Sequence, residues 1–314
     1  MNSFGKARMP FLFIIDFEMK AIRLFPLDKQ LPETVLYNFL NKGNSNVKRR
    51  KNSNFVFRKF PMSFEQYNLA FEEIQKHIRS GNTFLTNLTF PTLVETNLTL
   101  REIFFRSTAK YKLLVDNEFV CFSPESFVTI VDGTISTFPM KGTMKATSPD
   151  SEGKLLTDSK EIAEHNTVVD LLRNDLSMVA SLVKVKRFRY VERICLQDGE
   201  LLQVSSEISG TLPLNFQSGL GEIIFTLLPA GSVTGAPKNK TIAIIREVEK
   251  ADRGYYTGVC GVFDGKNLNS AVMIRYIENF NGSMRFRSGG GITFLSNAQT
   301  EYNELNDKVY VPVI

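Results

Sequence analysis

Apolar and polar residues alternate along much of the chain with the two-residue period of strands, which predicts a protein rich in sheet. Between residues 111 and 138 four such runs follow one another, YKLLVD, EFVCFS, FVTIV and TISTF. The pair Asp132-Gly133 is typical of a tight hairpin turn between the last two. Further strands are predicted for FLFII, FLTNLTF, TGVCGVF, NSAVMIRYIE and SMRFRSGGGITF.

Helical spacing of apolar residues separates groups of these strands. One helix is predicted to begin at Ser63, which forms a capping box with Gln66, and to end at Gly81. Others are predicted over residues 158–180 and 217–228, from Pro237 towards Gly254, and near the C-terminus. Because many strands follow one another through short hairpins, we predict an α+β protein with antiparallel sheets and helices packed outside them, and not a Rossmann series.

The composition is that of a soluble globular protein, with 43% apolar and 23% charged residues among 314. No run approaches the roughly 18 apolar residues that span a bilayer. The run FLFII ends at Asp16, so we interpret it as a first strand and not as a signal peptide. Three cysteines, Cys121, Cys195 and Cys260, make no disulfide framework, and two histidines argue against a Cys/His zinc site. We therefore expect a cytoplasmic protein with no membrane partner.

The excess of basic residues gives a net charge of +5, and its densest cluster runs from Lys48 to Lys51. This cluster lies in an Asn-rich stretch over residues 41–54, which is the only plausible seam in the chain. It could be a solvated loop or a nucleic-acid patch. No aromatic residues or nucleic-acid motifs accompany the charges, so we favour a loop and predict no nucleic-acid partner.

Two segments place acidic residues at helical spacing. In SKEIAEHNTVVDLLRND, Glu161, Glu164 and His165 share one helix face, and TEYNELNDK repeats the spacing with Glu301 and Glu304. Two acidic faces could converge on a hard divalent cation that keeps waters for an anionic substrate. Each pair on its own is equally typical of a solvated helix face.

Three features suit a bound anion. The glycines of RSGGGIT expose backbone amides, and PAGSVTGAPK is a glycine-rich turn that leads into a helix N-terminus. For each glycine cluster alone, turn geometry is an alternative explanation. Arg275 lies within the apolar run AVMIRYI, where a guanidinium needs a carboxylate from the protein or from a ligand.

Lys141 stands between a proline and a glycine in FPMKGTM, at the end of an apolar strand. A lysine there needs a partner, a role or a route to water. Glu125 in FSPESF precedes it by one hairpin, so the two side chains could face one pocket. A carboxyl and an amine in one desolvated site suit the roles of acid and nucleophile, and a simple salt bridge is the alternative.

Taken in order, these segments resemble the chorismate-utilising enzymes, and most of all component I of aminodeoxychorismate synthase. The resemblance covers the chain from about residue 63 to the end. The matching stretches are GNTFLTNLTF, FSPESF, FPMKGTM, KEIAEHNTVVDLLRNDL, LPAGSVTGAPK, RGYYTGVCGVFDG, AVMIRYIE and GGGITFLSNAQTEYNEL.

The resemblance implies one catalytic unit over residues 1–314, built from two antiparallel sheets that form a sandwich surrounded by helices, with the chorismate site between them. It implies Mg²⁺ held chiefly by Glu164 and Glu304, with Glu161 and Glu301 close by. The residues that it implies for substrate binding are Arg275, Tyr256, Gly289, Gly290, Gly291, Thr234, Lys308 and Thr143.

The resemblance also gives Lys141 a role in the formation of 4-amino-4-deoxychorismate for para-aminobenzoate and folate biosynthesis. Lys141 would add at ring C2 of chorismate, Glu125 would protonate the departing C4 hydroxyl, and ammonia from a separate glutaminase subunit would then add at C4. Anthranilate-forming relatives carry alanine in place of this lysine. The alternatives are component I of anthranilate synthase and a degenerate chorismate-binding protein.

Three departures from the family pattern qualify this expectation. Gln203 stands where family members commonly carry histidine, and it cannot shuttle a proton near pH 7. Leu85 stands where isochorismate and salicylate synthases place a lysine that activates water, which argues against water as the nucleophile. Residues 1–62 form a shortened N-terminal region without a recognisable tryptophan site, so we predict no feedback inhibition by tryptophan.

Overall fold

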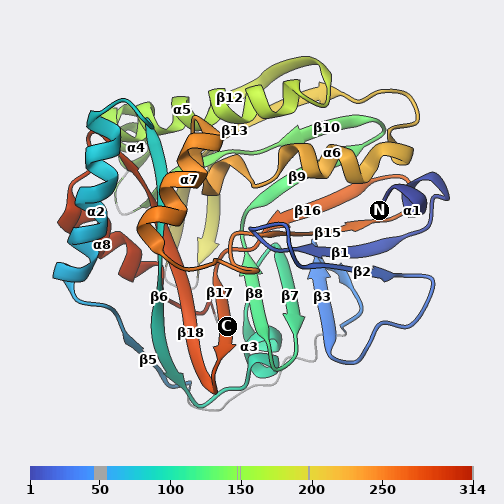
Figure 1. Cartoon of the computed structure of the whole chain (residues 1–314), viewed down its shortest axis with the longest axis horizontal. Helices are drawn as coiled ribbons and strands as arrows, with labels where there is room; N and C mark the ends of the chain where they lie inside the picture. The colour runs from blue at the N-terminus through green and yellow to red at the C-terminus, as the bar shows by residue number, and fades with distance from the viewer. Residues whose placement is uncertain (46–54, 147, 149, 197–198, 313–314) are drawn as a thin grey trace.

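The computed structural model describes residues 1–45, 55–146, 148, 150–196 and 199–312, and its strands form two sheets of nine strands each. The strands of one sheet run across those of the other (Figure 1). Neighbouring strands are antiparallel in both sheets, which confirms the predicted α+β class with two antiparallel sheets. The basic run from Lys48 to Lys51 and the side chains of Thr143 and Cys195 lie outside the described part of the chain.

The first sheet has the strand order β11-β13-β10-β9-β16-β15-β1-β2, with β12 beside β13. Its strands are β1 (Phe11–Ile15), β2 (Ile22–Pro26), β9 (Ser126–Val131), β10 (Thr134–Thr137), β11 (Met140–Lys145), β12 (Ser181–Leu196), β13 (Gly199–Thr211), β15 (Val259–Phe263) and β16 (Leu268–Val272).

The second sheet has the order β14-β6-β18-β17-β8-β7-β3-β4, with β5 beside β6. Its strands are β3 (Val35–Phe39), β4 (Lys42–Gly43), β5 (Phe57–Phe60), β6 (Leu85–Thr96), β7 (Tyr111–Val115), β8 (Phe119–Ser123), β14 (Gly235–Ala236), β17 (Tyr276–Phe280) and β18 (Ser283–Thr293).

The helices cover the outer faces of the two sheets, α2, α7 and α8 beside β6 and β18, and α5 and α6 over the first sheet (Figure 1). They are α1 (Asn2–Lys6), α2 (Phe64–Arg79), α3 (Leu100–Arg106), α4 (Ser151–Thr157), α5 (Ser159–Ser177), α6 (Leu220–Leu227), α7 (Lys238–Glu249) and α8 (Ala298–Asp307), with 3₁₀ turns η1 (Phe216–Gly219) and η2 (Gly231–Val233).

Strand β1 shows why FLFII has no polar positions. Its residues alternate between two buried surfaces. Leu12 and Ile14 pack with residues of the second sheet such as Leu113. Phe11 and Phe13 pack on the other side, in a cluster that includes helix residues of α5 and α6. Both faces of this strand are therefore covered, one by the partner sheet and one by helices.

Several predicted elements are confirmed. Helix α2 has the capping box of Ser63 and Gln66, and Gly81 follows it in the left-handed region at φ 72°. Strands β9 and β10 are joined by Asp132 and Gly133, with φ of 47° and 78°, as a two-residue hairpin with two positive φ angles requires.

Two predicted elements are wrong in extent. Helix α7 ends at Glu249, because Lys250 caps it at φ 54° well before Gly254. The run NSAVMIRYIE is two strands and not one, since β16 belongs to the first sheet and β17 to the second. The chain crosses between the sheets at residues 273–275, and apolar residues continue into the crossing segment because Met273 is buried in the core. In the described part of the chain, no helix is long and apolar enough to cross a membrane.

Candidate active site

A bulge at the start of β11 places Lys141. Strand β11 pairs with β13, but its register shifts between Met140, which faces Ser205, and Thr143, which faces Gln203. Gly142 adopts φ 80° within this irregularity, a conformation that a side chain disfavours. Such bulges redirect a side chain away from the regular ladder. The glycine after the lysine is therefore a local requirement of the backbone.

The amine of Lys141 lies between helix α5 and strand β18 of the second sheet. Its Nζ donates a hydrogen bond to Glu164 Oε2 at 3.4 Å, and its side chain is 21% exposed. On the other side lies β18, where a Cβ added at Gly291 would come within 2.9 Å of Nζ and 3.0 Å of Leu85 Cδ1. The absence of a side chain at Gly291 is thus what lets the lysine reach this point.

Two helices bring three of the four predicted carboxylates close to glycines of β11 and β18, and the fourth acts on Lys141 through its charge. From α5, Glu161 Oε2 would lie 3.2 Å from a Cβ at Gly142, and Glu164 Oε2 would lie 3.9 Å from one at Gly291. From α8, Glu301 Oε2 would lie 3.6 Å from a Cβ at Gly290, and Glu301 is only 3% exposed. Glu304 acts electrostatically on Lys141 and forms an ion pair of 2.7 Å with Lys308. Carboxylate oxygens are the ligands that a hard divalent cation takes, but among the described residues no three of these four carboxylates have oxygens within 4.8 Å of one another.

These carboxylates control the charge of Lys141. Burial on its own lowers the pKa of the ammonium, but the charges of Glu164, Glu304 and Glu161 outweigh it and hold the pKa above the ordinary value for lysine. The lysine is therefore an ammonium ion in the substrate-free protein.

The side chain of Glu125 is held by Ser232, a residue that the sequence pattern did not single out. Ser232, in the turn η2, donates a hydrogen bond to Glu125 Oε1. Burial raises the pKa of the Glu125 carboxyl, while this hydrogen bond and the charges of Lys141, Arg275 and Lys308 act to lower it. Glu125 and Ser232 also line a cavity together with Phe138, Asp175 and other residues. Only the fold brings FSPESF and PAGSVTGAPK together, so spacing could not have revealed the contact.

Arg275 lies in the connection between β16 and β17, at φ 53°, and not inside a strand as predicted. Its guanidinium carbon lies 5.2 Å from the centre of the Tyr310 ring. Among the described residues it forms no ion pair, so this cation remains available for an anionic ligand. Nearby, Tyr256 is 3% exposed, and burial raises the pKa of its phenol, which keeps it neutral.

The three glycines of β18 have a neighbouring strand on one side only. Strand β6 faces Gly289, Gly290 and Gly291, whereas β17 pairs with β18 only as far as Arg287. Lys308 Nζ donates a hydrogen bond of 2.9 Å to Gly289 O. Both backbone groups of a strand residue point to the same edge, so the N–H groups of Gly289 and Gly291 face away from β6. Two of the three predicted amide donors therefore point to the side from which Lys308 approaches, whereas the N–H of Gly290 points towards β6.

The turn in PAGSVTGAPK has mainly structural contacts. Thr234 Oγ1 donates to the carbonyls of Ala230 at 3.1 Å and Gly231 at 3.2 Å. A Cβ at Gly235 would lie 1.8 Å from Leu85 O, so this glycine permits the close pairing of β14 with β6. Lys238, the first residue of α7, forms a buried ion pair of 2.6 Å with Asp175. The glycines of PAGSVTGAPK are therefore explained by turn geometry and not by a bound anion. At the start of α7, Lys238 is already paired with the carboxylate of Asp175.

Two residues that departed from the family pattern lie close to the site. Gln203 is 6% exposed, and its Nε2 donates to Met140 Sδ at 2.7 Å, directly before Lys141. Leu85 places an apolar methyl group against Gly291.

His165 turns away from the carboxylates, because its Nε2 lies 2.7 Å from Ser206 Oγ. Burial, with Arg189 and Lys141 nearby, lowers the pKa of His165 to about 4, so its ring is neutral.

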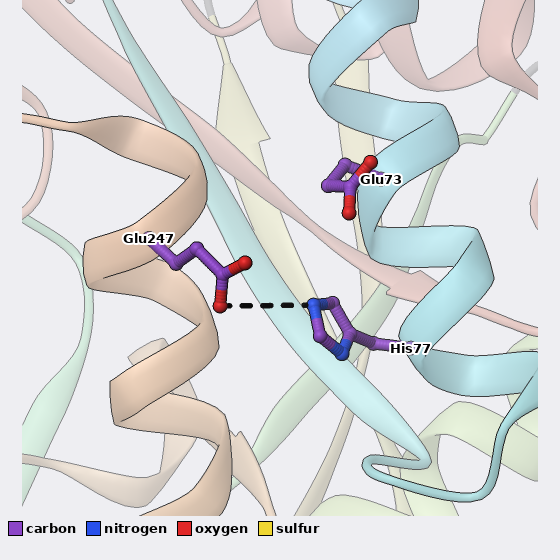
Figure 2. A group of neighbouring side chains, drawn as sticks. All are labelled: Glu73, His77 and Glu247. Carbon is purple, nitrogen blue, oxygen red and sulfur yellow. Dashed lines mark ion pairs between the residues drawn. The ribbon is translucent and has the colours of Figure 1, made fainter.

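A separate group with ligand-like geometry joins α2 and α7 (Figure 2). The ligand atoms of Glu73, His77 and Glu247 lie within 4.8 Å of one another. Glu73 already forms an ion pair of 2.8 Å with Lys76, and Glu247 is 64% exposed at 3.9 Å from His77 Nε2. These contacts are those of a surface ion-pair group, and none of the residues predicted for the site belongs to it.

Comparison with known proteins identifies relatives along most of the chain. The model of the chorismate binding enzyme family matches residues 27–313. An "Uncharacterized PabA-like protein" of Haemophilus influenzae is 51% identical over 312 residues, which are 99% of this chain and 95% of that protein. Component 1 of aminodeoxychorismate synthase from Bacillus subtilis is 31% identical over 80% of this chain and 55% of its own length.

Other relatives carry different names. An anthranilate synthase component 1 of Haloarcula marismortui is 34% identical over 75% of this chain and 49% of its own length. Among solved structures, the menaquinone-specific isochorismate synthase MenF of Escherichia coli superposes with a TM-score of 0.73, at 17% identity, over 98% of this chain and 78% of that one. At this identity the likeness concerns the fold alone.

Proposed function

Because the chain belongs to the chorismate binding enzyme family, we propose that it is component I of an aminodeoxychorismate synthase. In this proposal it converts chorismate and ammonia into 4-amino-4-deoxychorismate, in the branch that leads to para-aminobenzoate and folate. The observation that carries the proposal is the amine of Lys141, held 3.4 Å from Glu164 and directly against Gly291. An enzyme that places nitrogen at C4 through a covalent intermediate needs a buried nucleophile of this kind.

The reaction proceeds by two displacements. The Lys141 ammonium first releases a proton to water, and the neutral amine adds at ring C2. The ring double bonds shift, and the C4 hydroxyl leaves as water with a proton from Glu125. Ammonia then adds at C4, the double bonds shift back, and Lys141 leaves C2 as the free amine. The enolpyruvyl group is retained, and the net change is chorismate plus ammonia to aminodeoxychorismate plus water.

The remaining residues hold the dianionic substrate. Arg275, without an ion pair among the described residues, is suited to a substrate carboxylate, and Lys308 and the amides of Gly289 and Gly291 add donors beside it. In this proposal Tyr256 and Thr234, which the family resemblance also implies, line the same substrate site. The carboxylates of Glu164, Glu304, Glu161 and Glu301 are donors of the kind that Mg²⁺ takes, and in this proposal they would hold the ion, which would neutralise negative charge on the substrate.

Ammonia in this proposal comes from a separate glutaminase subunit, and free ammonium serves in its place in vitro. The runner-up is anthranilate synthase component I, which the identity to the Haloarcula marismortui enzyme favours. Lys141 argues against it, because amination at C2 requires no lysine nucleophile at that carbon. A degenerate protein that only binds chorismate is opposed by the retained carboxylates and by Lys141 itself.

The test is to incubate the protein with chorismate, Mg²⁺ and ammonium and to identify the product by mass and ultraviolet spectrum. Aminodeoxychorismate is the expected product. Anthranilate would establish the runner-up. Binding of chorismate without any product would leave the degenerate protein as the remaining explanation.

A further inference from the structure

The hydroxyl of Ser232 connects two motifs that lie far apart in the sequence. It donates a hydrogen bond to Glu125 Oε1. The backbone of Glu125 is also fixed, because its N–H donates to Ser123 Oγ at 3.1 Å and its carbonyl accepts from Val272 N–H at 3.2 Å. The carboxyl therefore has a defined backbone position and one oxygen engaged by a neutral donor.

The turn that carries Ser232 is itself rigidly held. Thr234 Oγ1 donates to the carbonyls of Ala230 and Gly231 and closes the turn. Behind it, a Cβ at Gly231 would lie 2.8 Å from Asp175 Oδ2, and Asp175 forms its buried ion pair with Lys238. Because buried groups fix the turn from both sides, the hydroxyl is in place before any substrate arrives.

Fixing Oε1 decides which oxygen carries the acidic proton. While Oε1 accepts the hydrogen bond from Ser232, the proton of the neutral carboxyl resides on Oε2. We propose that Ser232 is a positioning residue that orients Glu125 so that Oε2 is the oxygen that delivers the proton. This inference rests on the proposed function, in which Glu125 is the general acid, and it adds Ser232 to the residues that the reaction requires.

The experiment compares Ser232→Ala with Ser232→Thr, which keeps the hydroxyl, and with Ser126→Ala as a matched control. Ser126 lines the same cavity as Glu125, but its hydroxyl lies 3.1 Å from Tyr111 Oη. The readouts are kcat for chorismate consumption as a function of pH and the dissociation constant of chorismate. Because the Ser232 hydrogen bond lowers the pKa of Glu125, its loss should move the basic limb of the profile to higher pH.

We expect Ser232→Ala to lower the plateau of kcat by up to about tenfold, which is the upper end of the effect of losing one hydrogen bond. Chorismate binding should be unchanged, and Ser232→Thr and Ser126→Ala should behave like the unsubstituted protein. A pH profile of Ser232→Ala that superposes on that of the unsubstituted protein would overturn the inference.

A second measurement does not depend on turnover. The protonation of Glu125 can be followed by infrared difference spectroscopy, with Glu125→Gln to assign the carboxyl band. Ser232→Ala should shift this titration to higher pH, and an unshifted titration would overturn the inference even if the protein forms another product. Absence of aminodeoxychorismate with a shifted titration would instead count against the proposed function alone.

Discussion

The amine of Lys141 lies 3.4 Å from Glu164 Oε2, although one residue comes from a strand bulge and the other from a helix. Sequence spacing leaves a salt bridge and a nucleophile as equal explanations for this lysine. In the neighbouring strand β18, Gly291 leaves room for the amine, because a Cβ added there would lie 2.9 Å from Lys141 Nζ.

Substitution of Lys141 separates these two roles. Lys141→Arg keeps a cation beside Glu164, but a guanidinium stays protonated and cannot attack carbon. We expect Lys141→Arg to fold normally and to form neither aminodeoxychorismate nor a covalent adduct. We expect Lys141→Ala to form no adduct and either to lose turnover or to form anthranilate. Intact-mass spectrometry after incubation with chorismate and Mg²⁺, without ammonium, detects the adduct of the unsubstituted protein. Aminodeoxychorismate formed by Lys141→Arg would contradict the covalent role.

The glycines of β18 allow a matched pair of substitutions. In Gly291→Ala the added methyl would lie 2.9 Å from Lys141 Nζ and must displace the amine, whereas in Gly290→Ala the nearest atom would be Glu301 Oε2 at an ordinary 3.6 Å. We expect Gly291→Ala to lose adduct formation, and Gly290→Ala to retain most of it. Overpacking costs about 1–3 kcal/mol, so thermal unfolding of both variants should be measured beside the activity. Equal activities would show that the amine does not need the space at Gly291.

Much of the fold could be predicted from local patterns. The capping box at Ser63 and the hairpin at Asp132 are decided by nearby residues, so the sequence predicts them correctly. The run NSAVMIRYIE was wrongly predicted as one strand, because apolar residues continue through Met273 and Ile274, where the chain passes from one sheet to the other. Periodicity reports which residues are buried and does not report which sheet buries them.

The candidate site divides in the same way. Helical spacing correctly places Glu161 with Glu164 on α5 and Glu301 with Glu304 on α8, but only the fold brings both helices beside the adjoining glycines Gly290 and Gly291. Ser232 was missed for a related reason, since its partner Glu125 is more than a hundred residues away in the chain. The roles of these residues in catalysis remain predictions that the variants described here test.

Arg275 should be required for substrate binding. Its guanidinium has the Tyr310 ring beside it and, among the described residues, no ion pair to replace. Loss of a hydrogen bond to a charged group costs about 1.5–3 kcal/mol, so Arg275→Ala should weaken chorismate binding by roughly 10-fold to 150-fold. Isothermal titration with chorismate and Mg²⁺ measures this change. Arg285→Ala is the control, because Arg285 already pairs with Glu278 at 2.8 Å, and equal affinity of both variants would remove Arg275 from the binding site.

A stability prediction concerns Arg253, which is 1% exposed. Its side chain connects the 3₁₀ turn η2 with strand β6 and helix α7. Its guanidinium pairs with Glu249 at 2.7 Å and donates to the carbonyls of Val233 at 2.8 Å and Asn87 at 2.7 Å. Removing one partner of a buried ion pair costs about 3–5 kcal/mol, so Arg253→Met should lower the free energy of unfolding by that amount. Lys20→Met, which removes an exposed pair with Asp252, should cost less than about 1 kcal/mol. Chemical denaturation compares the two.

The last prediction concerns the pH dependence that Glu125 imparts. Burial raises the pKa of its carboxyl above the ordinary value, so the acid stays protonated to higher pH than an exposed glutamate. A general acid works only while protonated, and the rate should therefore fall as the pH rises through the folded-state pKa. Glu125→Gln should lower kcat by about 10²–10⁴-fold and remove this basic limb.

The raised pKa of Glu125 also predicts how the stability of the protein depends on pH. A carboxyl whose pKa is raised in the folded protein binds protons more tightly there than in the unfolded chain. Its contribution to the free energy of unfolding is full below the unfolded-state pKa and is lost as the pH rises through the folded-state pKa. At neutral pH, Glu125→Gln should therefore unfold at a higher denaturant concentration than the unsubstituted protein, while the exposed Glu33→Gln should show no change. A less stable Glu125→Gln variant would mean that the site stabilises the charged carboxylate, and Glu125 could then not serve as the acid.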